Sequence, residues 1–224
     1  MAKLEIACFH PDSARIAQEN GADRVELCAE MHVGGTTPSV DMVKNVRTQV
    51  QIDLNVMIRP RGGDFVYSVA EFEQMKQEIV AFKELAVDGF VFGVLDSNNA
   101  VNIAQNMELV ELAQPLPCTF HRAFDVVQNS DSALEDVIAC GFKTILTSGC
   151  EPNVDLGLVN LGKLVKQAAG RITIMPGGGL RSTNIAHVLT ETGVQYVHSS
   201  AITDGSETAV AEEVAALARV AKTL

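Results

Sequence analysis

The sequence predicts a (β/α)8 barrel, the TIM-barrel fold, in which residues 1–224 form a single domain. Eight short apolar runs alternate with longer segments of helical spacing, the pattern of repeated βα units. The end of a helix and the strand after it recur as a weak internal repeat at residues 19–28, 84–93, 139–148 and 191–200. An open doubly wound sheet would normally carry a GxGxxG motif after its first strand, and no such motif follows the first apolar run here. Four repeats of two βα units therefore indicate a closed ring of strands.

The elements follow one another in order. The apolar runs predict strands at residues 4–8, 24–28, 54–58, 89–95, 117–120, 144–147, 172–175 and 196–198. Helical spacing predicts helices at roughly residues 12–20, 39–49, 69–86, 102–113, 131–140, 155–169, 183–192 and 208–222. Residues that can satisfy free N–H groups in a first turn are Asp12 with Ser13, Pro38 with Ser39, Ser68 with Glu71, and Thr183. Gly21, Gly141 and Gly193 mark helix ends, where a positive φ is often needed.

Composition and charge narrow the class of protein. No Pro/Gly/Ser-rich linker divides the chain, and no apolar h-region or uncharged apolar run of about 18 residues is present. The five cysteines lack a CxxC pair, so neither a disulfide framework nor a structural zinc site is indicated. A net charge of -11 without a basic block argues against nucleic acid and anionic membranes. We therefore expect a cytoplasmic protein whose partner is a small molecule, a metal ion or another protein.

Polar residues gather at the carboxyl ends of the predicted strands, which form the active face of such a barrel. Strand parity places one set of side chains inside the barrel, because a charge in mid-strand is better placed there than under a helix. This set is Glu5, Ala7, Glu26, Cys28, Asn55, Met57, Arg59, Thr119 and His121. Glu5 and Glu26 would repel each other without a cation between them, and Arg59 is the expected cation. The alternative is a buried structural ion network.

The fifth strand leads directly into three residues that can carry chemistry. His121, Arg122 and Asp125 supply a base, a permanent cation and a carboxylate within five residues. We expect His121 to be the general acid or base, with Glu26 as its partner carboxylate and Asp125 in the same catalytic group. The alternative is that Arg122 and Asp125 only pair with each other at a strand-to-helix turn.

Two loops have the composition of anion-binding sites. The segment 58–67 carries Arg59 and Arg61 beside two glycines, and arginine presents a planar fork suited to carboxylate or phosphate. An Arg61–Asp64 pair that only shapes the turn is the alternative. After the seventh and eighth strands, residues that can form a phosphate cradle are Gly177, Gly178, Gly179, His198 and Ser199. The glycines can equally serve a tight turn.

Several motifs resemble those of one known family. They are Gly-Ala-Asp-Arg-Val-Glu-Leu-Cys ending at Cys28, Gly-Gly-Thr-Thr-Pro-Ser ending at Ser39, Ile-Arg-Pro-Arg-Gly-Gly-Asp-Phe ending at Phe65, Phe-His-Arg-Ala-Phe-Asp ending at Asp125, Leu-Thr-Ser-Gly ending at Gly149, and Met-Pro-Gly-Gly-Gly ending at Gly179. Over about residues 3–201 the chain resembles the CutC family of copper homeostasis proteins. The resemblance implies a cytoplasmic, homo-oligomeric barrel with a proposed link to intracellular copper and no established reaction. Beyond residue 201 the chain is shorter than the usual member.

The resemblance also implies a copper site, and this sequence departs from it. The family's copper proposal rests on cysteines in the first two strands, and the second of these falls on Cys28. The first falls on Ala7, while Cys8 stands one residue later and points the opposite way by parity. Cu(I) prefers at least two soft ligands, and here Met57 is the only sulfur near Cys28 in the inward set. We therefore expect weak copper(I) binding and no organic cofactor.

Two functions follow from these observations. The family resemblance implies a copper-handling protein without catalysis. The residues favour a barrel enzyme of lyase or isomerase type that acts on a small phosphorylated or carboxylated substrate, with Arg59, Arg61 and Arg122 holding the anion. No lysine stands at a strand end, so a Schiff-base aldolase is disfavoured. We also expect His121 and Glu26 to titrate within one hydrogen-bonded network.

Overall fold

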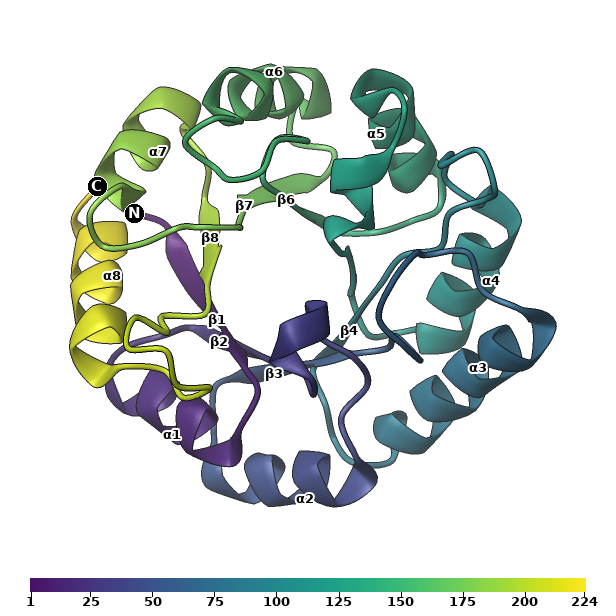
Figure 1. Cartoon of the computed structure of the whole chain (residues 1–224), viewed down its shortest axis with the longest axis horizontal. Helices are drawn as coiled ribbons and strands as arrows, with labels where there is room; N and C mark the ends of the chain where they lie inside the picture. Colours follow the sequence, from purple (N-terminus) through teal and green to yellow (C-terminus); the bar gives the residue numbers. More distant parts are fainter.

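The computed structural model describes all residues 1–224 and has eight strands that alternate with eight α-helices (Figure 1). The strands are β1 (Lys3–Cys8), β2 (Arg24–Leu27), β3 (Asp53–Met57), β4 (Gly89–Phe92), β5 (Cys118–Phe120), β6 (Thr144–Thr147), β7 (Thr173–Pro176) and β8 (Tyr196–Ser199). The helices are α1 (Pro11–Glu19), α2 (Val40–Gln49), α3 (Val69–Lys83), α4 (Ile103–Ala113), α5 (Ser130–Ala139), α6 (Leu158–Ala168), α7 (Ile185–Thr192) and α8 (Ala211–Thr223), with short 3-10 helices η1 (Met31–Val33) and η2 (Arg122–Val126). The predicted order of elements is confirmed, and the boundaries differ by a few residues.

The strands form one parallel sheet that curves into a barrel. Hydrogen-bonded neighbours run in the order β7-β6-β5-β4-β3-β2-β1-β8, and β7 lies beside β8 without a ladder between them. All helices lie outside this ring (Figure 1). Because the strands are parallel, their carboxyl ends meet at one face, and the loops that follow them surround the same opening. The predicted (β/α)8 barrel is confirmed.

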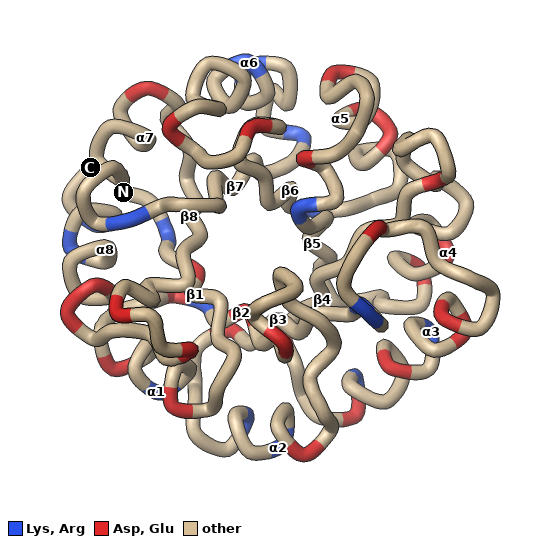
Figure 2. The backbone as a smooth tube through the Cα atoms, viewed as in Figure 1, with Lys and Arg blue, Asp and Glu red and all other residues tan.

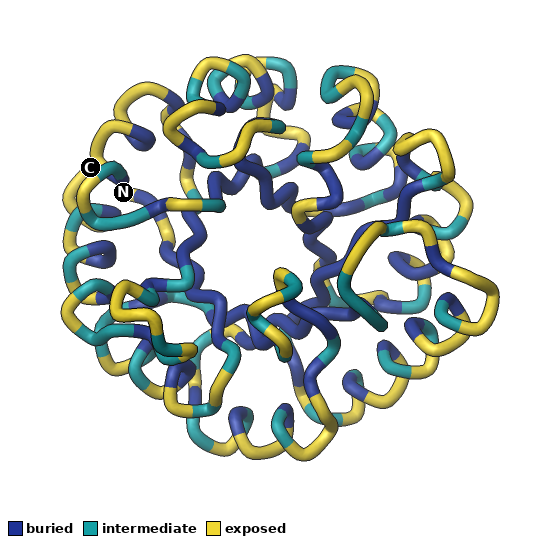
Figure 3. Tube along the Cα trace, in the orientation of Figure 1, coloured by how far each residue is buried: buried dark blue, intermediate teal, exposed yellow.

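Alternation along the strands separates two buried regions. Leu4, Ile6 and Cys8 of β1 face the helices and belong to a large apolar core between the helices and the outer surface of the sheet. Cys28, which directly follows β2, and Met57 of β3 instead belong to a small apolar cluster apart from that core. Figure 3 shows the inner ring of strands buried and the outer faces of the helices exposed. The predicted parity is confirmed, including the outward direction of Cys8.

Helix ends follow local sequence in most places. Ser39 accepts a hydrogen bond from the Met42 amide, and Ser68 forms the predicted capping box with Glu71. The prediction that Asp12 and Ser13 satisfy the free N–H groups at the start of the first helix was wrong, because His10 caps this helix and Pro11 occupies its first turn. The prediction that Thr183 caps a helix was also wrong, because α7 begins at Ile185 after Asn184 and no side chain caps its first turn.

The surface charges are spread over many elements. Acidic side chains are distributed around the ring of helices and loops (Figure 2), consistent with the net charge of -11. None of the helices combines the length and the apolar character required to cross a lipid bilayer.

Candidate functional site

A cavity of about 390 Å3 opens at the carboxyl ends of the strands. Its floor is formed by side chains that point into the barrel, and its walls by the loops after the strands. The lining residues are Ala7, Phe9, Glu26, Val33, Gly34, Met57, Arg59, Phe65, His121, Arg122, Asp125, Val126, Leu146, Gly178, Gly179, Arg181, His198, Ser199 and Ser200. The volume is within the range typical of small-molecule sites.

A buried ion network lies at the floor. Nε of Arg24 lies 2.5 Å from Oε2 of Glu5, and Oε1 of Glu5 lies 2.7 Å from Nδ1 of His198. Burial alone raises the pKa of Glu5, but the Arg24 guanidinium and the His198 hydrogen bond outweigh it and lower the pKa to about 2. Glu5 is therefore ionised and can only accept, so Nδ1 of His198 donates the hydrogen bond. This contact fixes the ring and leaves Nε2 as the nitrogen that can exchange a proton.

Glu26 lies next to that nitrogen. Its Oε2 is 3.8 Å from Nε2 of His198, and its buried Oε1 has no hydrogen-bond partner. Burial raises the pKa of Glu26 to about 7, with the charge of Glu5 adding to the effect and His198 opposing it. Burial lowers the pKa of His198, but Glu26 and the hydrogen bond to Glu5 outweigh it, so that its pKa is raised overall. The pair can therefore share one proton near neutral pH.

The structure corrects the predicted partner of the two carboxylates. The prediction that Arg59 lies between Glu5 and Glu26 was wrong, because Arg24 and His198 take that position. Arg24 is the register partner of Glu5 on the neighbouring strand. Arg59 stands beyond the end of β3, and its guanidinium donates to the carbonyl oxygens of three loop residues at 2.9 Å: Val33, Gly35 and Gly63. It therefore holds two loops together.

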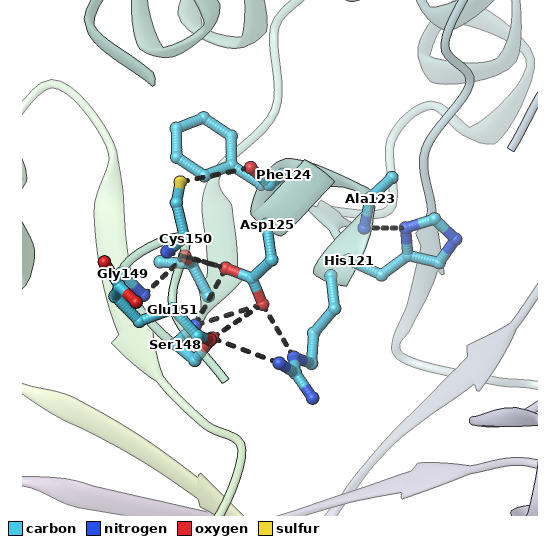
Figure 4. Close-up of polar contacts among 10 residues, drawn as sticks. His121, Ala123, Phe124, Asp125, Ser148, Gly149, Cys150 and Glu151 are labelled. Atoms are coloured by element: carbon cyan, nitrogen blue, oxygen red, sulfur yellow. Dashed lines mark hydrogen bonds and ion pairs between the residues drawn. The ribbon is translucent and has the colours of Figure 1, made fainter. Parts of the chain in front are cut away.

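His121 is separate from the Glu26 network, and the prediction that they share one was wrong. Nδ1 of His121 accepts a hydrogen bond from the Ala123 amide at 3.3 Å, and buried Nε2 has no partner. Burial, together with the charge of Arg59, lowers the pKa of His121 to about 3. His121 is therefore neutral at physiological pH. Figure 4 shows its ring directed away from Asp125.

Asp125 organises the loop after β6. It pairs with Nε of Arg122 at 2.7 Å and accepts hydrogen bonds from the Thr147 hydroxyl and from the amides of Ser148 and Cys150 (Figure 4). The predicted alternative, an Arg122–Asp125 pair at the strand-to-helix turn, is thus present. With its oxygens occupied in this way, Asp125 is placed to position Arg122 and this loop.

Two arginines line the cavity, Arg122 from η2 after β5 and Arg181 from the loop after β7. Arg122 donates from Nη2 to the Ser148 hydroxyl at 3.0 Å, and its side chain remains 44% exposed. Arg181, which the sequence analysis did not single out, contacts the Ser199 hydroxyl at 3.3 Å. Its position two residues after the glycine run was the available indication. Arg61 is not in the cavity lining, because it pairs with Asp64 and Glu71.

The glycine run offers free amides at the same border. Gly178 and Gly179 have φ of +99° and +79°, and their N–H groups donate to no other group of the chain. The guanidinium of Arg122 lies against Gly178, since a Cβ there would be 3.0 Å from Cζ of Arg122. Gly177 is different, because its amide donates to the Thr147 carbonyl at 3.0 Å. The predicted use of the Gly177 amide for an anion is therefore contradicted.

Two groups of residues have the donor atoms for a metal. Ligand atoms of Glu5, Glu26 and His198 lie within 4.8 Å of one another, although Glu5 is already bound to Arg24 and His198. The second group is Cys28 with Glu26, in which Sγ of Cys28 lies 3.5 Å from Oε2 of Glu26. Burial is the main cause that raises the pKa of the Cys28 thiol, and the charge of Glu26 adds to it. Cys28 packs with Met57 in the small inner cluster, whereas Cys8, Cys118 and Cys140 belong to the outer core.

Comparison with known proteins gives matches over most of the chain. The family model described as the CutC family matches residues 2–203. The human copper homeostasis protein cutC homolog is 44% identical over 198 residues, covering 88% of this chain and 72% of that protein. A CutC family protein of Chromobacterium violaceum is 43% identical over 198 residues, covering 88% and 80%.

Solved structures agree with these matches. A crystal structure of the copper homeostasis protein CutC from Streptococcus agalactiae has a TM-score of 0.86 at 35% identity and covers 91% of this chain and 100% of that chain. Phosphoribosyl anthranilate isomerase from Thermotoga maritima has a TM-score of 0.68 at 13% identity, with full coverage of both chains. At that identity the second likeness shows the barrel fold alone.

Proposed function

The chain belongs to the CutC family, in which curated relatives are named copper homeostasis proteins, and from that premise we propose that it is an enzyme of the copper homeostasis system. Its reaction is acid–base chemistry on a small phosphorylated or carboxylated substrate bound at the barrel mouth. The observation that carries this proposal is the Glu26–His198 pair on the floor of a cavity whose border holds Arg122, Gly178 and Gly179.

The roles follow from the contacts. His198 exchanges protons at Nε2 while Glu5 holds the ring in one tautomer, and Glu26 is the second acid or base. A pKa of about 7 for Glu26 suits proton transfer at neutral pH, where both protonation states are populated. Arg122 and the two free amides bind the anionic group. His121, which is neutral and bonded to its own loop, is replaced by His198 in the role first predicted for it.

The reaction type is proton abstraction or an isomerisation that depends on it. We propose to incubate the protein in D2O with a panel of small phosphorylated and carboxylated carbonyl compounds and to follow loss of C–H signals by proton NMR. Exchange is expected with at least one compound, and His198→Gln and Glu26→Gln should each abolish it. The exposed change Glu135→Gln is the control and should leave the exchange rate intact. Absence of exchange and of phosphate binding across the whole panel would contradict the proposal.

A second candidate function is copper(I) binding, for which Cys28 and Met57 supply the observation. A Cβ on Gly35 would lie 3.4 Å from Sγ of Cys28 and 3.5 Å from the terminal methyl of Met57, so the two sulfur side chains meet at one place. One thiolate and one thioether make a weak site for Cu(I). The raised pKa of the Cys28 thiol weakens it further, because the metal must displace a proton.

Location and assembly are part of the same proposal. We infer a single-domain protein that works in the cytoplasm as a homo-oligomer, as the family likeness first implied. Light scattering coupled to gel filtration tests the assembly, and a mass of 24.0 kDa, that of one chain, would contradict it.

A further inference from the structure

The cavity has two unlike walls. Arg122, Gly178, Gly179 and Arg181 line one side, from the loops after β5 and β7, and Val126 and Leu146 are the apolar residues of the lining on that side. The loops after β1, β2 and β3 form the other side with three apolar side chains, which are Phe9, Val33 and Phe65. Below them, Phe9 packs on the buried cluster of Cys28, Met57 and Val91. A ligand held by the cationic side therefore faces an apolar surface.

The apolar wall is braced by Arg59. The guanidinium lies 4.7 Å from the centre of the Phe65 ring and donates to the carbonyl oxygens of Val33 and Gly63, one in each of two neighbouring loops. His121 meets the same ring edge-on at 4.9 Å. Val33 packs tightly on the next loop, since a Cβ on Gly62 would be 2.5 Å from its Cβ. The wall is thus fixed by contacts that also use both Nη groups of Arg59.

This wall offers few polar partners to a ligand. The Nη groups of Arg59 donate to backbone carbonyls, and Nδ1 of His121 is occupied by the Ala123 amide, so the atoms left without a partner here are the buried Nε of Arg59 and the buried Nε2 of His121. A polyol placed here would lose water from its hydroxyl groups and regain few hydrogen bonds. An apolar group would instead gain from leaving water.

We propose that the substrate is a phosphate monoester whose remainder is a flat apolar group, such as an aryl ring, lying between Phe9, Val33 and Phe65. This inference rests on the proposed anion site and adds the chemical class of the group that the anion carries. The phosphate lies against Arg122 and the amides of Gly178 and Gly179, and the ring extends toward the opposite wall.

Calorimetry with three probes tests it: inorganic phosphate, phenyl phosphate and glycerol 3-phosphate. Phenyl phosphate is expected to bind at least about tenfold more tightly than glycerol 3-phosphate, because its ring buries apolar surface. Val33→Thr keeps the shape of the wall but makes it polar, and Phe65→Leu shortens it. Each should reduce the preference for phenyl phosphate about threefold or more while inorganic phosphate binds as before, and unchanged thermal midpoints show that the variants fold.

The outcomes separate the two proposals. Arg122→Gln should weaken all three probes, as the anion site requires. If inorganic phosphate binds but glycerol 3-phosphate binds as tightly as phenyl phosphate, the apolar substrate class is overturned and the anion site stands. An unchanged preference in both wall variants also overturns it. If none of the three probes binds, the proposed anion site fails, and the inference fails with it.

Discussion

Nδ1 of His198 lies 2.7 Å from Oε1 of Glu5, although the two residues are close to opposite ends of the chain. They are register partners on β8 and β1, the strands whose pairing brings the last strand to the first. A slip of one residue in that pairing would turn one of the two side chains out of the barrel. The pairing of the last strand with the first therefore also brings together the residues at the floor of the candidate site.

Removing the charge of Glu5 should destabilise the fold. In Glu5→Gln, Arg24 keeps its charge in a buried position without its partner, and breaking a buried pair typically costs about 3 kcal/mol or more. Glu135→Gln is the matched control, because Glu135 pairs with Arg171 at 2.6 Å on the surface, where solvent screens such pairs and they contribute little to stability. Urea unfolding of both variants measures the difference. Equal losses would show that the Glu5 pair is not the stabilising element assigned here.

The contribution of Glu26 to the stability of the native chain should fall as the pH rises from about 4.5 to 7, while His121, whose pKa burial lowers to about 3, contributes in the opposite direction over much of this window. Glu26 has a pKa of about 7 in the folded chain against 4.5 when exposed, so the folded state binds more protons than the unfolded state in this window. The shift corresponds to roughly 3 kcal/mol. Glu26→Gln cannot lose this proton but keeps His121, so the free energy of unfolding of the native chain should fall relative to that of Glu26→Gln as the pH rises across the window. Urea unfolding at a series of pH values checks this, and parallel curves for the two proteins would contradict it.

Local pattern was enough to predict the fold. Strand and helix positions follow from apolar periodicity, and glycines such as Gly21 and Gly193 do take positive φ near helix ends. The errors are local: the sequence pattern places the start of the first helix at Asp12 with Ser13, whereas Nδ1 of His10 accepts a hydrogen bond from the Asp12 amide and Pro11 follows it. Parity along each strand also predicted which side chains enter the barrel, because the side-chain period of a strand is fixed.

The partners inside the barrel could not be predicted in the same way. Strand parity gives the direction of a side chain, but it does not give the position along the barrel axis that the end of a long side chain reaches. Arg24 reaches Glu5 because the two are level in the register, whereas Arg59 stands above and turns to the loops. Loop paths also decide which arginines reach the cavity. Sequence pattern alone therefore predicts Arg61 as an anion-binding residue, whereas the structure places Arg181 in the cavity lining and Arg61 outside it.

Copper(I) binding should be weak in the native chain and depend on Cys28. Cys28→Ser should abolish it, because Cys28 is the cysteine that packs with Met57 in the small inner cluster, while Cys8, Cys118 and Cys140 belong to the outer core. Ala7→Cys should strengthen it clearly by adding a second thiol from β1, because Ala7 lines the cavity together with Met57. Cys8→Ser is the control and should have no effect, because Cys8 faces the helices. Competitive Cu(I) titration under reducing conditions measures all four proteins, and native binding as tight as that of Ala7→Cys would contradict the assignment.

The last prediction separates anion binding from backbone strain at the glycine run. Gly178→Ala places a Cβ 3.0 Å from Cζ of Arg122 at a φ of +99°, so the guanidinium must move away from the free amides. Gly193→Ala has a similarly positive φ of +67° but meets nothing within 4 Å. Both changes should lower the free energy of unfolding by about 1 kcal/mol or more through strain. Only Gly178→Ala should also weaken binding of inorganic phosphate, by about tenfold, because it displaces a charged contact of roughly 1.5 kcal/mol. Calorimetry and urea unfolding of the two variants give both quantities, and equal phosphate affinities would place the anion away from Gly178.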